Sequence, residues 1–270
     1  MDDRPIGVFD SGLGGLTTVR ELCRLLPEED IVYFGDTGRV PYGSRSRETI
    51  VKYARQDVAF LRTFDLKAIV IACGTVSTTA LDVLAAENPI PVLGVVAPAA
   101  RAAAQATRSG SIGLIGTQAS IRSGAYERLI RAENPAARVL AQPCPLFVPL
   151  VENGRFRPGD VVIETVAAEY LAQLKAAGVD TLVLGCTHYP LLEKVIGAYM
   201  GPEVRLINSG AEGARAAADC LRERDALAGP GRGSCRCFVS DRQEGFSRLA
   251  STFLGWDVAQ AVEQVDISQY

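Results

Sequence analysis

Two cysteines follow apolar runs of the kind that form buried strands. Cys186 comes after Thr181 to Leu184 and one glycine, and Cys73 comes after Ile69 to Ala72. His188, the only histidine of the chain, lies two residues after Cys186. In open α/β sheets, ligands bind beyond the carboxyl ends of the strands. Both thiols and the imidazole are therefore expected at a binding site.

Two thiols that face each other across a cleft could exchange protons with the two faces of one carbon atom. One cysteine would act as a thiolate base and the other as a thiol acid, and the roles would swap with the direction of the reaction. A thiol near its ordinary pKa of about 8.5 is a poor base at neutral pH, so the thiolate needs a neighbouring cation or helix N-terminus. The pattern predicts acid–base chemistry at carbon.

Zinc binding is the rival use of paired thiols. Structural zinc sites take four ligands from closely spaced pairs of cysteine or histidine. Cys235 and Cys237 are a close pair without a second pair or a histidine beside them, so we predict no metal site. We interpret five cysteines as structural or incidental: Cys23, Cys144, Cys220, Cys235 and Cys237.

A glycine-rich turn follows the first predicted strand. The strand covers 6–10, the turn runs from Ser11 to Gly15, and a helix is predicted over 16–26. The glycine spacing matches neither a P-loop nor a dinucleotide fingerprint. The first amides of such a helix favour an anion, and a small carboxylate fits better here than a nucleotide.

Strands and helices alternate along the rest of the chain. Further strands are predicted over 31–34, 68–72, 91–96, 111–117, 139–141, 181–184, 204–207 and 237–240. Further helices are predicted over 48–64, 77–87, 123–132, a stretch within 159–178, 190–200, 211–224 and 246–254. The connections 35–44, 143–152 and 227–234 are rich in proline or glycine and are predicted loops. The alternation predicts parallel sheets with helices on both faces.

The pattern of the first hundred or so residues restarts in the middle of the chain. The run from Ser111 to Thr117 resembles that from Pro5 to Ser11, 106 residues earlier, and Cys186 follows Cys73 by 113 residues. Similar offsets predict an internal duplication. We expect two similar doubly wound α/β domains related by a pseudo-twofold axis, with the active site in the cleft between them. The expected domains are residues 1–97 plus 208–270, and residues 98–207.

Composition and charge exclude several classes of protein. The chain has 270 residues, of which 48 % are hydrophobic and 22 % charged, as in ordinary globular proteins. A net charge of −3 gives no nucleic-acid footprint, and no apolar run approaches the ~20 residues of a membrane span. The charged start shows no signal peptide. Seven cysteines without framework spacing indicate free thiols in the cytoplasm.

Five motifs, in order between about Ile6 and Gly210, resemble those of bacterial glutamate racemases. They are Gly7 to Gly15, Tyr33 to Thr37 with Arg39 to Gly43, Ala72 and Cys73 with Thr75, Cys144 to Glu152, and Leu184 to Pro190. This family interconverts L- and D-glutamate without a cofactor. Two cysteines deprotonate and reprotonate Cα, and the D-glutamate is used in peptidoglycan. Its members are often homodimers, but no dimer surface can be identified in this sequence.

The resemblance implies a role for individual residues. Cys73 and Cys186 would be the acid–base thiols, with Asp10 assisting Cys73 and His188 assisting Cys186. Residues that would bind glutamate are Ser11, Pro41, Tyr42, Gly43, Ser44, Gly74, Thr75, Thr117 and Thr187. Asp36 and Glu152 would line or tune the site. Simpler interpretations remain: Asp10 could cap the following helix, Asp36 could belong to a turn, and Glu152 could be solvated.

One departure from the family bears on substrate affinity. The family usually has asparagine after the first catalytic cysteine, where this chain has Gly74. Either a neighbour such as Thr78 compensates for the missing amide, or the substrate is held more loosely.

Three other functions remain open. The site could racemise aspartate or another acidic amino acid, because the reach of its carboxylate-binding groups cannot be read from the sequence. The chain could be a ligand-binding relative with weakened catalysis. It could also be a cysteine hydrolase that uses Cys186 and His188, which would leave Cys73 without a role.

Overall fold

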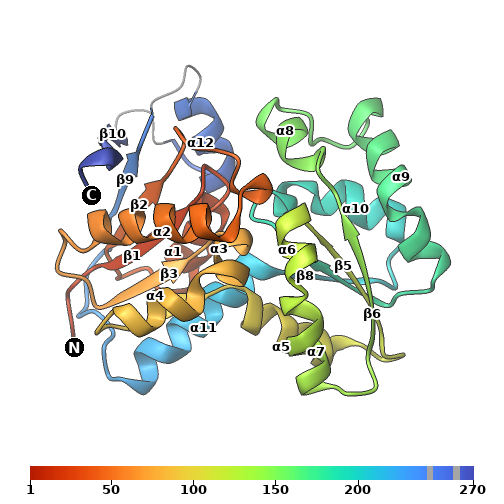
Figure 1. Ribbon diagram of the computed structural model, residues 1–270, viewed down its shortest axis with the longest axis horizontal. Helices are drawn as coiled ribbons and strands as arrows, with labels where there is room; N and C mark the ends of the chain where they lie inside the picture. Colours follow the sequence, from red (N-terminus) through yellow and green to blue (C-terminus); the bar gives the residue numbers. More distant parts are fainter. Residues whose placement is uncertain (242–245, 258–261) are drawn as a thin grey trace.

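Two parallel β-sheets lie side by side in the computed structural model, which describes residues 1–241, 246–257 and 262–270 (Figure 1). The larger sheet contains β1 (Ile6–Asp10), β2 (Ile31–Gly35), β3 (Ala68–Ile71), β4 (Val92–Gly94), β9 (Cys235–Val239) and β10 (Val262–Gln264). The smaller sheet contains β5 (Ser111–Gly116), β6 (Arg138–Pro143), β7 (Thr181–Leu184) and β8 (Arg205–Asn208). All neighbouring strands in both sheets pair in parallel, as the alternating pattern predicted.

The two sheets share one topology. The larger sheet has the order β10-β9-β2-β1-β3-β4, and the smaller has the order β6-β5-β7-β8, so four strands recur in the same arrangement. In this correspondence β3 matches β7, and Cys73 and Cys186 follow these two strands. The predicted doubly wound α/β fold with a repeated sheet is confirmed. We propose that residues 1–97 with 208–270 and residues 98–207 form the two domains.

Helices cover both faces of the larger sheet. On one face lie α1 (Leu16–Leu25), α11 (Ser209–Glu223) and α12 (Phe246–Leu254). On the other lie α2 (Arg47–Leu61), α3 (Gly74–Thr79) and α4 (Leu81–Glu87). Alternate residues of a strand point to opposite faces, so Val8 packs in the core with α1, whereas Phe9 packs with α2. This two-sided burial explains why the strands read as continuous apolar runs.

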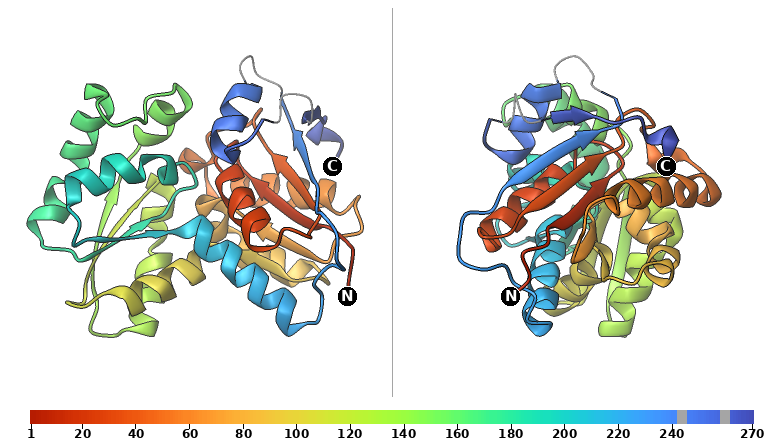
Figure 2. Two further views of the ribbon diagram at one scale, coloured as in Figure 1. Left: turned by 180° about the vertical axis from the view of Figure 1, so that it is seen from behind. Right: turned by 90° about the vertical axis from the view of Figure 1, so that its left-hand side faces the viewer.

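The smaller sheet is covered in the same way. On one face lie α8 (Phe147–Glu152), α9 (Val161–Ala176) and α10 (Glu193–Met200). On the other lie α5 (Val96–Ala106), α6 (Gln118–Ser123) and α7 (Ala125–Glu133). Short 3₁₀ turns are η1 (Tyr42–Ser44), η2 (Tyr189–Leu192) and η3 (Ile267–Gln269). After β8, α11 takes the chain back to the larger sheet and packs against α1 (Figure 2).

Three helices were not expected from the sequence: α5, α6 and α8. Two of them, α5 and α8, have proline in the first turn. Pro98 is the third residue of α5, and Pro149 is the third residue of α8, within the region predicted as a proline-rich loop. The first amides of a helix have no intrahelical acceptor, so proline is tolerated there. Proline was therefore a misleading sign of a loop within 143–152.

The helix expected over 77–87 begins earlier and is broken. It starts at Gly74, directly after Cys73, and divides into α3 and α4 at Ala80. The hydroxyls of Thr78 and Thr79 both donate to the Thr75 carbonyl, at 3.0 and 2.6 Å. Such side-chain bonds to the backbone compete with regular helix. The early start makes Cys73 the N-cap residue of α3.

A buried ion pair ties distant segments to the larger sheet. The ammonium group of Lys67 pairs with Glu29 and donates to the carbonyl oxygens of Asp2, at 2.7 Å, and Ala226, at 2.9 Å. Glu29 accepts a bond from the amide of Ala228 at 2.8 Å. Both charged side chains are almost fully buried.

Among the described residues, no helix combines the length and apolar composition needed to cross a membrane.

Removing one member of this pair should be strongly destabilising. Lys67→Met leaves the Glu29 carboxylate buried without a cation, and we expect a loss of about 3–5 kcal/mol in the free energy of unfolding, measured by urea denaturation. Adding Glu29→Gln should recover part of that loss, because no unpaired charge is left. Arg24→Met, in an exposed pair with Glu21, is the control and should cost about 0–1 kcal/mol. Equal losses for Lys67→Met and the control would contradict this account.

Candidate active site

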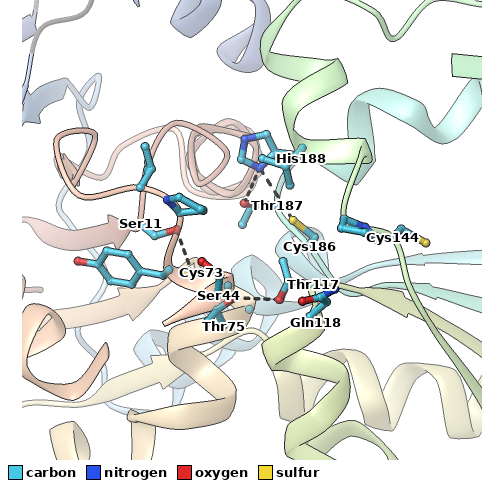
Figure 3. Close-up of a pocket in the computed structure, with 18 of the residues that line it drawn as sticks. Ser11, Ser44, Cys73, Thr75, Thr117, Gln118, Cys144, Cys186, Thr187 and His188 are labelled. Atoms are coloured by element: carbon cyan, nitrogen blue, oxygen red, sulfur yellow. Dashed lines mark hydrogen bonds between the residues drawn. The ribbon is translucent and has the colours of Figure 1, made fainter. Parts of the chain in front are cut away.

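A cavity of about 390 Å³ opens between the ends of the two sheets (Figure 3). Most residues expected at the site line it: Ser11, Pro41, Tyr42, Gly43, Ser44, Cys73, Gly74, Thr75, Thr117, Glu152, Cys186, Thr187 and His188. Asp10 and Asp36 are not among the lining residues. Lining residues that the sequence did not single out as site residues are Gly12, Val40, Gln118, Cys144, Pro145, Val148, Pro149 and Gly185. Cys73 and Cys186 approach the cavity from opposite sides (Figure 3).

Cys144 was interpreted as structural or incidental, yet it belongs to the cavity wall. It follows β6 at the edge of the smaller sheet, and its thiol donates to the carbonyl oxygen of Gln142 at 3.6 Å. The sequence signal was the proline on either side of it, Pro143 and Pro145, within a motif already noted. No comparable signal marked Gln118.

Cys73 lies between the first glycine turn and the start of α3. Its thiol donates to the hydroxyl of Ser11 at 3.4 Å. Burial and the nearby carboxylate of Asp10 raise the pKa of Cys73 to about 12. Cys73 is therefore a protonated thiol at neutral pH, able to give a proton rather than take one.

Asp10 is the last residue of β1 and directly precedes the glycine turn. One carboxylate oxygen accepts hydrogen bonds from the amides of Gly12, at 3.2 Å, and Gly15, at 2.9 Å. The other oxygen is buried and has no hydrogen-bond partner within the described part of the chain. Burial raises the pKa of this carboxyl group. Two amides of the turn that precedes α1 are thus occupied by the chain's own carboxylate.

Cys186 has a different partner. Its sulfur lies 3.9 Å from Nδ1 of His188, and Nε2 of the same ring lies 3.0 Å from Oε1 of Glu152. Burial alone disfavours the imidazolium, but the bonds to Cys186 and Glu152 prevail and raise the pKa of His188 to about 10. A cation beside a sulfur favours the thiolate. Glu152 is therefore a hydrogen-bonded partner of the imidazole, not merely a solvated side chain.

The position of His188 explains one glycine of the turn. A β-carbon at Gly14 would lie 2.5 Å from Nδ1 of His188 and would also collide with the hydroxyl of Thr187. The Phe253 ring of α12 and the imidazole pack nearly perpendicular to each other, with 5.3 Å between ring centroids. His188 is thus held by groups from both sheets.

Polar contacts cross the boundary between the two sheets around the cavity. The hydroxyls of Thr75 and Thr117 lie 3.1 Å apart, and the hydroxyl of Thr17 donates to the carbonyl of Thr187 at 2.9 Å. These bonds fix the separation of the two walls. Five residues with aliphatic hydroxyls line the cavity and could bind a carboxylate or an amine: Ser11, Ser44, Thr75, Thr117 and Thr187.

Gly74 fits closely against the opposite wall. A β-carbon there would lie 2.7 Å from the carbonyl oxygen of Gly185, so any side chain would push the backbone of the two walls apart. Thr78 does not line the cavity, and its hydroxyl is bonded within its own helix. The structure therefore gives no support to Thr78 as a replacement for the asparagine amide.

The two cysteines should differ in reactivity. Iodoacetamide reacts with thiolates, so at pH 7.5 we expect carboxamidomethylation of Cys186 at least about tenfold faster than that of Cys73. Peptide mass spectrometry distinguishes the seven cysteines. Glu152→Gln should slow the reaction at Cys186 and leave Cys73 unchanged, because Glu152 supports the imidazolium. Faster labelling of Cys73 would contradict the assignment.

The only histidine permits a direct titration. We expect the imidazole resonances of His188 to titrate near pH 10 in the proton NMR spectrum instead of at the ordinary 6.5. Because the folded-state pKa is the higher one, His188 protonation contributes stability that is complete below about pH 6.5 and is lost as the pH rises through about 10. Glu152→Gln should lower the titration midpoint. An unchanged midpoint in that variant would show that the Glu152 contact is unimportant.

Comparison with known proteins agrees with this geometry. A sequence profile of the Asp/Glu/Hydantoin racemase family matches residues 9–217. A glutamate racemase from Geobacter metallireducens is 49 % identical over 256 residues, which cover 94 % of each chain. A glutamate racemase isoform from Bacillus anthracis has a similar structure, with a TM-score of 0.93, 38 % identity and 98 % of each chain covered. The Francisella tularensis glutamate racemase, solved with D-glutamate, has a TM-score of 0.92 at 38 % identity over 100 % of both chains. The chain therefore belongs to the Asp/Glu/hydantoin racemase family, and within that family to the glutamate racemases.

Proposed function

We propose that this protein interconverts L- and D-glutamate by proton transfer between Cα and two cysteines, without a cofactor. The observation that carries the proposal is the pair of thiols at equivalent strand ends, Cys73 and Cys186, lining opposite sides of one cavity. The D-glutamate held by the Francisella relative supports the choice of substrate.

The resting enzyme has one base and one acid. The thiolate of Cys186, beside the imidazolium of His188, removes the Cα proton of one enantiomer. The thiol of Cys73 then gives its proton to the opposite face of the carbanion, which leaves Cys73 as the thiolate and Cys186 as the thiol. The form left by this turnover, with Cys73 as the thiolate and Cys186 as the thiol, deprotonates the other enantiomer at Cys73, and the same transfers run in reverse. The hydroxyl of Ser11 can rotate, so it accepts a hydrogen bond from the Cys73 thiol and donates one to the Cys73 thiolate.

The substrate's negative charge must be offset for this reaction to proceed. A free carboxylate next to Cα opposes formation of a carbanion, so donors that bind the carboxylate lower the barrier. Donors among the residues that line the cavity are the backbone of Gly43 and the hydroxyls of Ser11, Ser44, Thr75, Thr117 and Thr187. We propose these as the groups that hold the substrate's carboxylates and amine.

We further propose that the D-glutamate made here is used for peptidoglycan, as the membership of the glutamate racemases suggests. The cytoplasm is the proposed location of the reaction. All seven cysteines are free thiols, which supports a reducing compartment.

Exchange of the Cα proton tests the activity and its cofactor independence together. Incubation with L-glutamate in heavy water, without pyridoxal phosphate, should produce D-glutamate with deuterium at Cα, detected by NMR and chiral chromatography. L-aspartate is tested alongside. Exchange with aspartate alone would move the specificity and keep the mechanism. Absence of exchange, with glutamate binding by calorimetry, would support the ligand-binding alternative.

Single substitutions test the two thiols. Cys73→Ala and Cys186→Ala should each lower kcat for racemisation by at least about 10²–10⁴-fold, since each removes a proton carrier. Cys220→Ala, a cysteine of α11 that does not line the cavity, is the matched control and should retain activity. Full racemisation by either active-site variant would refute the two-thiol mechanism.

A further inference from the structure

A group of buried charges lies beside the loop that forms one wall of the cavity. The guanidinium of Arg39 donates from Nε to Oδ2 of Asp36 at 2.6 Å and from Nη2 to Oδ1 of Asp57 at 2.9 Å. Its Nη1 donates to Gln56 at 2.6 Å, and the group stacks 4.2 Å above the centroid of the Tyr53 ring. Both carboxylates are fully buried. None of Arg39, Asp36 and Asp57 lines the cavity.

Tyr42 links this charge cluster (Arg39, Asp36 and Asp57) to the cavity. Its hydroxyl contacts Oδ2 of Asp36 and lies 3.1 Å from Oδ2 of Asp57. Tyr42 is also the first residue of η1, and the whole segment from Pro41 to Ser44 lines the cavity. The charge cluster therefore holds the segment from Pro41 to Ser44 through its contacts with the buried phenol of Tyr42.

Counting protons assigns a charge to each carboxyl group. The phenol has one proton, so it donates to one carboxylate only, and the second contact requires a proton on the other carboxyl group. Oδ2 of Asp36 accepts from both Tyr42 and Arg39, which fits an anion. Burial and the neighbouring charge of Asp36 raise the pKa of Asp57 well above its usual range. One cation, one anion and one neutral acid then leave no net charge in the buried cluster.

We propose that Arg39, ionised Asp36 and protonated Asp57 are positioning residues that fix Tyr42, and with it the wall from Pro41 to Ser44, for substrate binding. The proton of Asp57 is donated to the phenolic oxygen of Tyr42, whose own proton is donated to Asp36. Arg39 donates to both carboxyl groups and fixes their separation. This inference rests on the proposed function, because it concerns how the same cavity holds glutamate.

Two amide substitutions distinguish the charge states of the two carboxyl groups. Asp57→Asn keeps the shape and neutrality of a protonated acid, since its Nδ2 can donate to Tyr42 and its Oδ1 can accept from Arg39. We expect KM for both enantiomers of glutamate to rise by less than about threefold. Asp36→Asn removes the anion that neutralises Arg39, and we expect KM to rise by about tenfold or more, with a smaller change in kcat. A loss that is mainly in KM indicates a fault in binding and not in proton transfer.

A third variant tests the hydrogen bonds apart from charge. Asp57→Leu is as neutral as Asp57→Asn but can neither donate to Tyr42 nor accept from Arg39. It should raise KM by about tenfold, and the asparagine variant serves as its conservative rescue. Arg55→Gln is the control, because Arg55 lies in α2, the helix that also contains Asp57, and pairs with Glu87 at an exposed site. It should leave KM unchanged.

Folding and protonation are checked independently of activity. Thermal unfolding shows whether each variant is folded at the assay temperature, and only folded variants are compared. Infrared spectroscopy at pH 7 should show the carbonyl stretch of a protonated carboxylic acid in the wild type that is missing from Asp57→Asn.

The outcomes separate this inference from the proposed function. A wild-type protein that does not racemise glutamate refutes the function before any variant is compared. With an active wild type, a mild Asp36→Asn and a severe Asp57→Asn would reverse the assigned charges and overturn the inference. Unchanged KM in the folded Asp36→Asn and Asp57→Leu variants would show that the cluster does not position the wall.

Discussion

Close contact between the two strand-end walls is the constraint on which the site depends. Two positions show it most clearly: a β-carbon at Gly14 would overlap His188, and one at Gly74 would lie 2.7 Å from the carbonyl of Gly185. Without side chains at these places, the walls approach until the hydroxyls of Thr75 and Thr117 meet at 3.1 Å. The glycines of the turn from Ser11 to Gly15 are therefore important because they leave room for the imidazole of His188 and for the side chain of Asp10. A cavity of about 390 Å³ between the walls is the consequence, and electrostatic interactions are stronger in such a cavity than in bulk water.

The repeated topology gives two similar places, and the side chains around them make the places chemically different. Burial and the nearby carboxylate of Asp10 keep the proton on Cys73, whereas its hydrogen bond to the Ser11 hydroxyl acts in the opposite direction. Cys186 has an imidazolium supported by Glu152. Two groups of one chemical type thereby receive different surroundings, as happens with paired carboxylates in other enzymes. In the mechanism that we propose, these surroundings let Cys186 begin as the base and Cys73 as the acid.

Charge burial away from the cavity has a separate role in this fold. The pair of Lys67 and Glu29 joins the chain start and the segment after α11 to the larger sheet. The cluster of Arg39, Asp36 and Asp57 has two carboxyl groups and one guanidinium, and in our proposal a proton on Asp57 balances the charges. Desolvated charges are costly unless each is matched, and the matching fixes geometry more strictly than apolar packing would. Asp36, expected to line or tune the site, contributes through Tyr42 and not by direct contact with the cavity.

The sequence alone determined the alternation of strands and helices, the repeat, and the position of Cys73 and Cys186 at equivalent strand ends. Periodicity and short spacings are local properties, and the neighbourhood of Cys186 and His188 is set by two residues of separation. Proline hid α8, because its cost depends on its place in the first turn, which the sequence does not mark. Only the tertiary structure decided which partners meet: Glu152 with His188 across 36 residues, Ser11 with Cys73 across 62, and Thr17 with Thr187 across 170. It also decided that Asp10 accepts hydrogen bonds from the amides of Gly12 and Gly15 and that Cys144 lines the cavity. These contacts depend on how two sheets pack against each other, and packing is a property of the whole chain that no local pattern contains.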